Sequence, residues 1–157
     1  MVMKKFLFIL ATMVVSCNDR QPQEQVQPTV TESSAETISE DIDAKAIEKI
    51  QTFYRNYIFG RQEATDSVIA QYCTKTLAQK LRDDYDNEFS EGGGYAIWEF
   101  RTGLQDGVSS TSSVESVRPL GDGWYRVSFL DLGVAGETDV KVENGKITDF
   151  RRNDVKR

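Results

Sequence analysis

Histidine is absent from this sequence of 157 residues. Serine and cysteine nucleophiles usually depend on a neighbouring histidine as general base, and histidine is also a common ligand of zinc and iron. Its absence therefore excludes Ser-His-Asp and Cys-His catalysis and histidine-ligated metal sites. We predict that the chain carries neither a cofactor nor a metal ion.

Cysteine is nearly absent, because Cys17 and Cys73 are the only two in the chain. Cys73 belongs to a series of apolar residues, including Ile69 and Leu77, that recurs at every fourth position. A free cysteine in such surroundings usually packs as a small hydrophobic group. Cys73 is therefore predicted to be a core residue rather than a nucleophile.

Positive charge is scarce, with 19 lysines and arginines against 25 acidic residues and a formal net charge of −6. Binding to nucleic acid requires a basic face, and electrostatic attraction to anionic lipid requires clustered lysines and arginines. The sequence therefore predicts no nucleic-acid partner. Attachment to a membrane would need an anchor other than charge.

The chain has no long hydrophobic run, and its longest is the ten residues 6–15, in which Thr12 alone is polar. As a helix this run would measure about 15 Å, roughly half the thickness of a bilayer's hydrocarbon core. Lys4 and Lys5 precede it. A positive start followed by a short apolar run is typical of a signal peptide.

The residues that follow the apolar run are Val14, Val15, Ser16 and Cys17. They resemble the lipobox of bacterial lipoproteins, in which the chain is cleaved before a cysteine that carries lipid, palmitate included. The resemblance implies that residues 1–16 are removed and that Cys17 attaches the protein to a membrane. The expected location is the cell envelope, with the outer membrane favoured and the face left open. An ordinary secretory signal with an incidental cysteine is the alternative.

Residues 18–40 contain no aromatic residue, no glycine and two of the three prolines. Such a polar segment cannot bury enough apolar surface to order itself. Together with the lipidated Cys17, it is predicted to form a disordered tether over residues 17–40. Residues 41–157 are predicted to form a single domain.

The first half of this domain has helical periodicity. Apolar residues recur at spacings of three and four over residues 41–59, and Gly60 is a natural end. A second helical pattern covers residues 65–85, where Thr74 could cap a new helix and divide the pattern in two.

The second half has strand periodicity. Residues 124–130 alternate, with Tyr125 on one face and Trp124 on the other, and the Asn144-Gly145 pair predicts a tight hairpin. The predicted strands are residues 114–117, 124–130, 138–142 and 146–151. Helices followed by an antiparallel meander predict an α+β fold, with N-terminal helices packed on the sheet.

Four short motifs lie in this domain: FYRNYI at residues 53–58, YCT at 72–74, QD at 105–106 and WYRVSF at 124–129. They resemble a bacterial lipoprotein family catalogued as domain of unknown function 3828. The resemblance covers about residues 47–150 and implies a curved antiparallel sheet wrapped around N-terminal helices, like that of nuclear transport factor 2 or cystatin. Such folds often form a conical pocket, although the family brings no established activity.

The chain departs from that family in the loop. Residues 98–104 lack the Asp-Pro-Phe sequence that often precedes the Gln-Asp pair, and the serine-rich residues 109–113 replace a segment that usually bears tryptophan.

Two other patterns favour ordinary structural roles. Residues 83–88 hold four carboxylates, but a calcium loop that begins at Asp84 would place Phe89 where an EF-hand needs glycine. The cluster is therefore predicted to be a solvated helix end. Residues 92–94 are three glycines without a following Lys-Ser/Thr, which favours a flexible loop over a phosphate site.

Four aromatic and three polar residues are candidates to line a pocket: Tyr54, Tyr57, Trp98, Arg101, Gln105, Asp106 and Trp124. Aromatic residues at such spacings more often belong to the core. The favoured function is non-catalytic binding of an envelope protein or a small molecule at the membrane. A pocket enzyme of isomerase or hydrolase type, with Asp106 as base and a tyrosine hydroxyl as oxyanion donor, is the first alternative. A structural spacer lipoprotein is the second.

Overall fold

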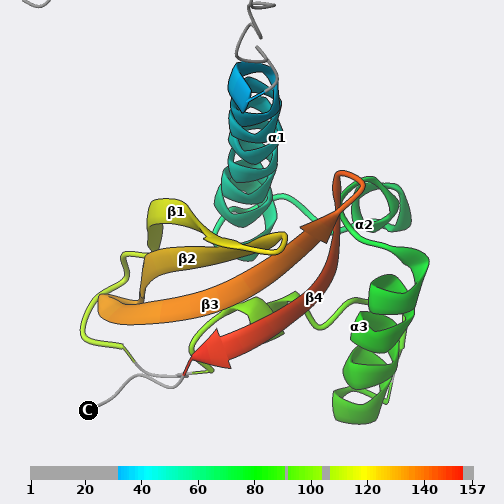
Figure 1. The fold of residues 1–157 in the computed structure, drawn as a ribbon. Helices are drawn as coiled ribbons and strands as arrows, with labels where there is room; N and C mark the ends of the chain where they lie inside the picture. The colour runs from blue at the N-terminus through cyan, green and yellow to red at the C-terminus, as the bar shows by residue number, and fades with distance from the viewer. Residues whose placement is uncertain (1–31, 91, 104–106, 154–157) are drawn as a thin grey trace, which may run out of the picture. The chain divides into compact units, whose positions relative to one another are not determined.

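The computed structural model describes residues 32–90, 92–103 and 107–153, with side chains from residue 40 onward. The chain divides into two units, Met1–Val30 and Thr31–Arg157, and every described residue belongs to the second. This unit has the predicted α+β architecture, with helices first and an antiparallel sheet after them (Figure 1). Cys17, Gln105 and Asp106 lie outside the described residues, so the predictions that concern them stay predictions.

Helix α1 spans Glu32–Phe53 and continues as a short π-helix, η1, over Tyr54–Ile58. Ala46, Ile50 and Phe53 are buried at the spacing that one helix face requires. The chain leaves the helix at Gly60, where a Cβ atom would lie 2.1 Å from the carbonyl oxygen of Asn56. Only glycine fits that close approach, so Gly60 ends the helix as the sequence predicts.

The start of α1 differs from the sequence prediction. The helix begins at Glu32, so residues 32–40 form its first turns rather than the last part of the tether. Proline and glycine are both absent between Pro28 and Gly60. Once packing has fixed the C-terminal half of a helix, each further residue adds a hydrogen bond without a new nucleation cost. A polar stretch without helix breakers therefore continues the helix.

Helices α2 (Asp66–Tyr72) and α3 (Lys75–Glu88) confirm the predicted break at Thr74. The Thr74 side chain accepts a hydrogen bond from the backbone N–H of Leu77, which caps α3. The Thr74 N–H itself donates to the carbonyl oxygen of Ile147, at 2.9 Å. The helical pattern is therefore interrupted where the chain meets the sheet. A short 3-10 helix, η2 (Ile97–Phe100), follows α3.

Four antiparallel strands form the sheet in the order β1-β2-β3-β4. Tight turns join them, and Asn144 and Gly145 both have positive φ, as the predicted two-residue hairpin requires. A similar turn at Leu132 and Gly133 starts β3 earlier than the sequence predicts. Leucine rarely takes positive φ, so residue 132 carries no turn signal in the sequence. The bounds are Ser113–Gly121, Trp124–Asp131, Val134–Glu143 and Lys146–Asn153.

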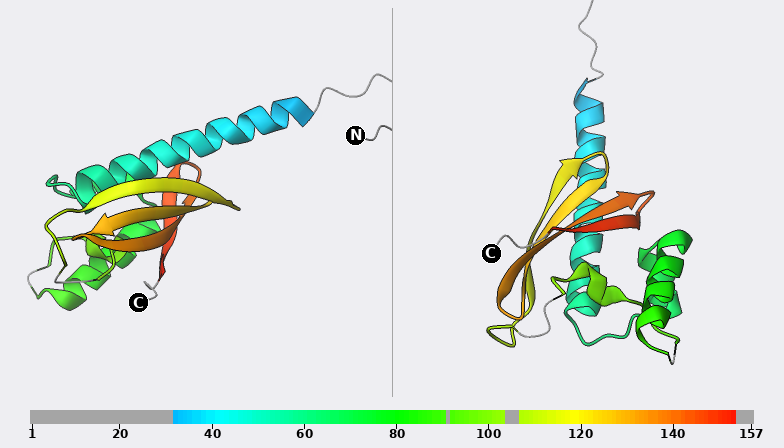
Figure 2. Two further views of the ribbon diagram at one scale, coloured as in Figure 1. Left: turned by 90° about the vertical axis from the view of Figure 1, so that its left-hand side faces the viewer. Right: turned by 90° about the horizontal axis from the view of Figure 1, so that it is seen from below.

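One face of the sheet carries the core. Along β2, Tyr125, Val127 and Phe129 are buried, and the residues between them are only partly covered. Helix α1 lies against this face near β1, whereas α2 and α3 lie beside β4 (Figure 2). All residues of the buried hydrophobic core lie between Ala46 and Ile147 in the sequence, so the core belongs wholly to this unit. Among the described residues, no helix is both long and apolar enough to cross a bilayer.

Candidate functional site

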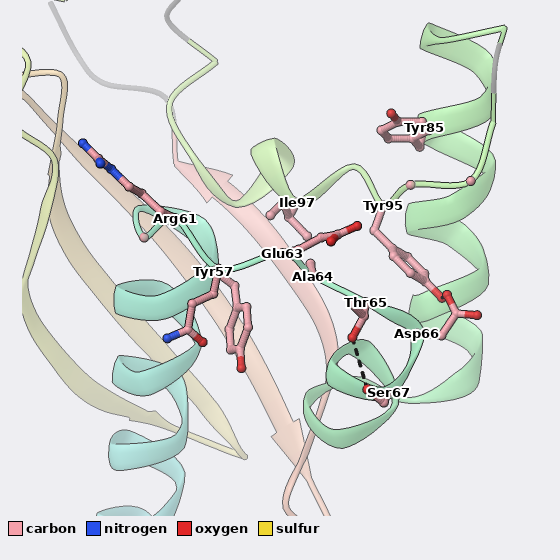
Figure 3. Close-up of a pocket in the computed structure, with 14 residues that line it drawn as sticks. Tyr57, Arg61, Glu63, Ala64, Thr65, Asp66, Ser67, Tyr85, Tyr95 and Ile97 are labelled. Carbon is pink, nitrogen blue, oxygen red and sulfur yellow. Dashed lines mark hydrogen bonds between the residues drawn. The ribbon is translucent and has the colours of Figure 1, made fainter.

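A broad cavity of about 830 Å³ opens between the end of α1 and the two following helices (Figure 3). Its wall on one side is Tyr57 of η1 together with residues 60–67. The opposite wall is Tyr85 of α3 together with residues 93–95 and Ile97. Tyrosine rings, backbone and small hydroxyl side chains therefore face one another across an open recess.

Neighbouring rings hold the cavity tyrosines in place. The ring of Tyr57 lies 6.0 Å from that of Phe53 and 5.6 Å from that of Tyr72, between centroids. The ring of Tyr85 lies 5.6 Å from that of Trp98. Aromatic pairs at such distances stabilise each other beyond their buried area. The cavity therefore has a preformed aromatic lining.

The glycine segment lies directly over one of these rings. A Cβ atom on Gly94 would lie 2.3 Å from a ring carbon of Tyr85, so a larger residue would push the chain away from the ring. Gly92 and Gly93 have positive φ, with values of 63° and 90°. Gly94 is therefore needed for the close approach to the ring, whereas Gly92 and Gly93 are needed for a backbone conformation that glycine adopts without strain.

A polar network joins the two sides of the cavity. Arg82 donates to Asp66 Oδ1 at 2.7 Å, and the Tyr95 hydroxyl donates to the same oxygen at 3.0 Å. The guanidinium also lies 4.6 Å from the centroid of the Tyr95 ring. The hydrogen bond from Tyr95 and then those from Arg82 lower the pKa of Asp66. The carboxylate therefore stays charged and orients Tyr95 at the rim.

Of the seven candidate pocket residues, Tyr57 lines this cavity. Tyr54 is fully buried, and its hydroxyl donates to the carbonyl oxygen of Phe100 at 3.3 Å. Burial raises its pKa far above the ordinary value. Trp98 is partly buried behind the wall, where its ring lies 5.5 Å from that of Phe89. Trp98 therefore supports the cavity wall through Tyr85, whereas Tyr54 belongs to the core.

Arg101 and Trp124 lie elsewhere. Arg101 forms an ion pair with Asp131 at the end of β2. Trp124 occupies the sheet face opposite the core, where the Arg151 guanidinium lies 4.2 Å from its ring centroid. The structure therefore does not bring Arg101 and Trp124 to the cavity that Tyr57 lines.

Asp131 is the polar residue that sequence reasoning missed. Its side chain is fully buried and accepts hydrogen bonds from Arg101 Nε at 3.1 Å and from the Thr102 hydroxyl at 2.8 Å. Burial alone would raise the pKa of this carboxyl group, but the bonds from Arg101 and Thr102 outweigh it and leave the pKa lowered. One sequence signal could have identified it: Asp131 continues the alternation of Tyr125, Val127 and Phe129, so an acidic residue occupies an inward position of the strand.

Cys73 is buried, with 1% of its surface exposed, which confirms the predicted core position. Burial raises the pKa of its thiol to about 12. The thiolate form, which is the nucleophile, is therefore disfavoured at neutral pH.

The acidic end of α3 forms pairs within the helix. Lys80 forms an ion pair with Asp84 at 2.5 Å, and Gln79 donates to Asp83 at 2.8 Å. Both are the i, i+4 contacts of a solvated helix face. Within the described ranges, no group of three or more acidic or cysteine residues could hold a metal ion.

Comparison with known proteins gives no relative: no protein-family model, no curated protein and no solved structure matches this chain.

Proposed function

We propose that this chain is a lipid-anchored bacterial envelope protein whose domain binds a ligand, without catalysis, in the cavity between η1, α2 and α3. The cavity itself carries the proposal. Its volume of about 830 Å³ falls within the range of small-molecule sites. Ring contacts and the Asp66 network support its walls, so little ordering is needed on binding.

The lining suits a ligand with both apolar and polar groups. The rings of Tyr57, Tyr85 and Tyr95 offer large faces from the two walls, and Thr65 and Ser67 add hydroxyl groups on the wall that includes Tyr57. Tyrosine is common in recognition surfaces because one end of its side chain is apolar and the other is polar. A small organic molecule or a peptide side chain has the chemistry to fill such a recess.

The envelope location rests on the N-terminal motif and on the resemblance to the lipoprotein family. We expect Cys17→Ser to abolish incorporation of labelled palmitate and to release the protein from membranes. Fractionation of cells that express the wild type and the variant tests this. A variant that remains in the membrane fraction, together with a wild type that takes up no label, would contradict the anchor.

Ligand binding is tested on residues 17–157 carrying Cys17→Ser, purified gently and examined by native mass spectrometry. We expect a reproducible mass excess that Ser67→Trp removes, because this exposed residue lines the cavity. Ser116→Trp, an exposed position on β1, is the matched control and should keep the excess. A clean apo mass for both Ser67→Trp and its unsubstituted parent would contradict a tightly held ligand. A mass excess that Ser67→Trp leaves in place would contradict binding in this cavity.

A further inference from the structure

A second recess lies on another side of the domain, where α1 leaves the sheet. This groove has a volume of about 330 Å³. One wall belongs to α1 and consists of Ile42, Lys45, Ala46 and Lys49. The other wall is formed by Tyr125 of β2, Val142 of β3 and Gly145 of the last hairpin. None of these residues lines the cavity of the proposed function, so the two recesses are separate.

The groove exists because the apolar face of α1 continues past the core. Ile50 is completely buried, Ala46 is 6% exposed and Ile42 is 59% exposed, although they follow one another at four-residue spacing. Ala46 is too small to fill the space between helix and sheet. Ile42 therefore leaves apolar surface in contact with water, at a cost of roughly 25 cal/mol for each Å².

Tyr125 closes the floor without adding a free polar group. Its ring is 3% exposed, and its hydroxyl donates to Asp43 at 2.6 Å. That bond satisfies the hydroxyl and fixes the ring beside Val142. The inner surface of the groove is therefore apolar and rigid.

Positive charge gathers at the hairpin end of the groove. Lys49 donates to the carbonyl oxygen of Gly145 at 2.6 Å, and Lys146 donates to that of Ala70. Among the described residues, neither lysine has a carboxylate within ion-pair distance, whereas Lys45 forms an ion pair with Asp41. Burial first, and then the nearby Lys146, lower the pKa of Lys49. Lys49 therefore lines the groove without an ion-pair partner in the described part of the chain, and Lys146, which follows Gly145 in the hairpin, is a second cation near Lys49 although it does not itself line the groove.

We propose that this groove binds a fatty-acid-like anion, whose single apolar chain lies along Ile42, Ala46 and Val142 and whose carboxylate meets Lys49 and Lys146. A group about the size of a water molecule occupies roughly 30 Å³, so the groove holds a chain of about ten carbon atoms. A single chain therefore fits this volume better than the two chains of a phospholipid. The charge at one end and the apolar floor along the rest match an amphiphile rather than a uniformly acidic peptide.

The probe is decanoate, titrated by calorimetry into residues 17–157 with Cys17→Ser, so that no acyl group of the protein competes. We expect saturable one-to-one binding, and an affinity about tenfold lower in Lys49→Gln, which loses one charge-assisted hydrogen bond. The double variant Lys49→Gln/Lys146→Gln should bind more weakly still. Lys75→Gln is the matched control, because this exposed lysine begins α3 and does not line the groove.

The apolar end is tested by Ile42→Gln, which should also weaken binding while leaving the thermal unfolding temperature unchanged, since Ile42 is mostly exposed. Equal binding of decyltrimethylammonium, unchanged affinity in the double lysine variant, or non-saturable uptake would overturn the proposal. Loss of decanoate binding in Ser67→Trp would place the anion in the other cavity and overturn it as well. Failure here leaves the mass-spectrometric test of the first cavity unaffected.

Discussion

Two aspartates tie loops together in this domain, and they do so in opposite surroundings. Asp131 and Asp66 each accept hydrogen bonds from an arginine and from a hydroxyl group. The Asp131 side chain has no exposed surface, whereas 81% of the Asp66 side chain is exposed. Breaking a buried pair is costly because a charged group loses its partners, whereas water replaces the partners of an exposed pair. The same bonding pattern therefore locks the loop at Asp131 but only orients side chains at Asp66.

The largest effect is expected for Asp131→Ala. This change removes the acceptor for Arg101 and Thr102 and should lower the free energy of unfolding by about 3 kcal/mol. Urea unfolding followed by tryptophan fluorescence measures it. A loss below about 1 kcal/mol would mean that water replaces the carboxylate as easily as it does at an exposed pair. The contrast between Asp131 and Asp66 would then be contradicted.

The stability difference between the wild type and an Asp131 variant should depend on pH, because the pKa of Asp131 is lowered in the folded state. A group whose pKa is lower in the folded state stabilises the fold fully above its unfolded value, which is about 3.9 for aspartate. The stabilisation is lost as the pH falls through the lower folded value. The gap between wild type and Asp131→Asn should therefore be constant from pH 7 to 5 and shrink below about pH 4. Urea midpoints across this range test it, and a gap that widens on acidification would contradict the sign.

A smaller effect is expected at the cavity wall. Gly94→Ala places a methyl group against the ring of Tyr85 and should cost about 1 to 3 kcal/mol through overpacking. The comparison variant is Gly93→Ala, where a Cβ atom meets nothing within 4 Å but the backbone has positive φ. Thermal unfolding measures both. If only Gly94→Ala also removes the native mass excess, close packing rather than backbone strain shapes the cavity.

The smallest effect is expected for Asp66→Asn. Because the carboxylate is exposed, its loss should leave the urea midpoint unchanged at physiological salt. The rate at which an external quencher reaches tyrosine fluorescence should rise slightly, since the Tyr95 hydroxyl loses its charged acceptor while Arg82 still contacts the ring. A destabilisation comparable to that of Asp131→Ala would show that this network also holds the fold together.

Periodicity predicted much of the architecture. The spacing of Ile50 and Phe53 identified the buried face of α1, and the alternation along β2 separated Tyr125 from Trp124. Periodicity could not say which face of the strand meets the helices, so Trp124 was grouped with pocket residues although it lies on the opposite face. The extent of α1 was missed because local polarity does not reveal that packing elsewhere supports a helix.

The cavity was less predictable than the fold. Tyr57 was identified, but Ser67, Tyr85 and Tyr95 were not, because they come from segments that only the tertiary fold brings together. Arg101 was expected to face a cavity, and its partner Asp131 lies 30 positions away along the chain. Pairing of that kind depends on how the chain after η2 packs against the end of β2, which local sequence patterns do not encode.

The contact between α1 and the last strands has a consequence for the order of folding. Each strand of the sheet pairs with its neighbour in the chain. By contrast, the bond from Tyr125 to Asp43 spans 82 positions, and that from Lys49 to Gly145 spans 96. Contacts between distant positions form slowly because a long loop must close first. The first described helix to be synthesised thus waits for the last hairpin, so α1 gains its full set of contacts only after nearly all of the domain has been synthesised.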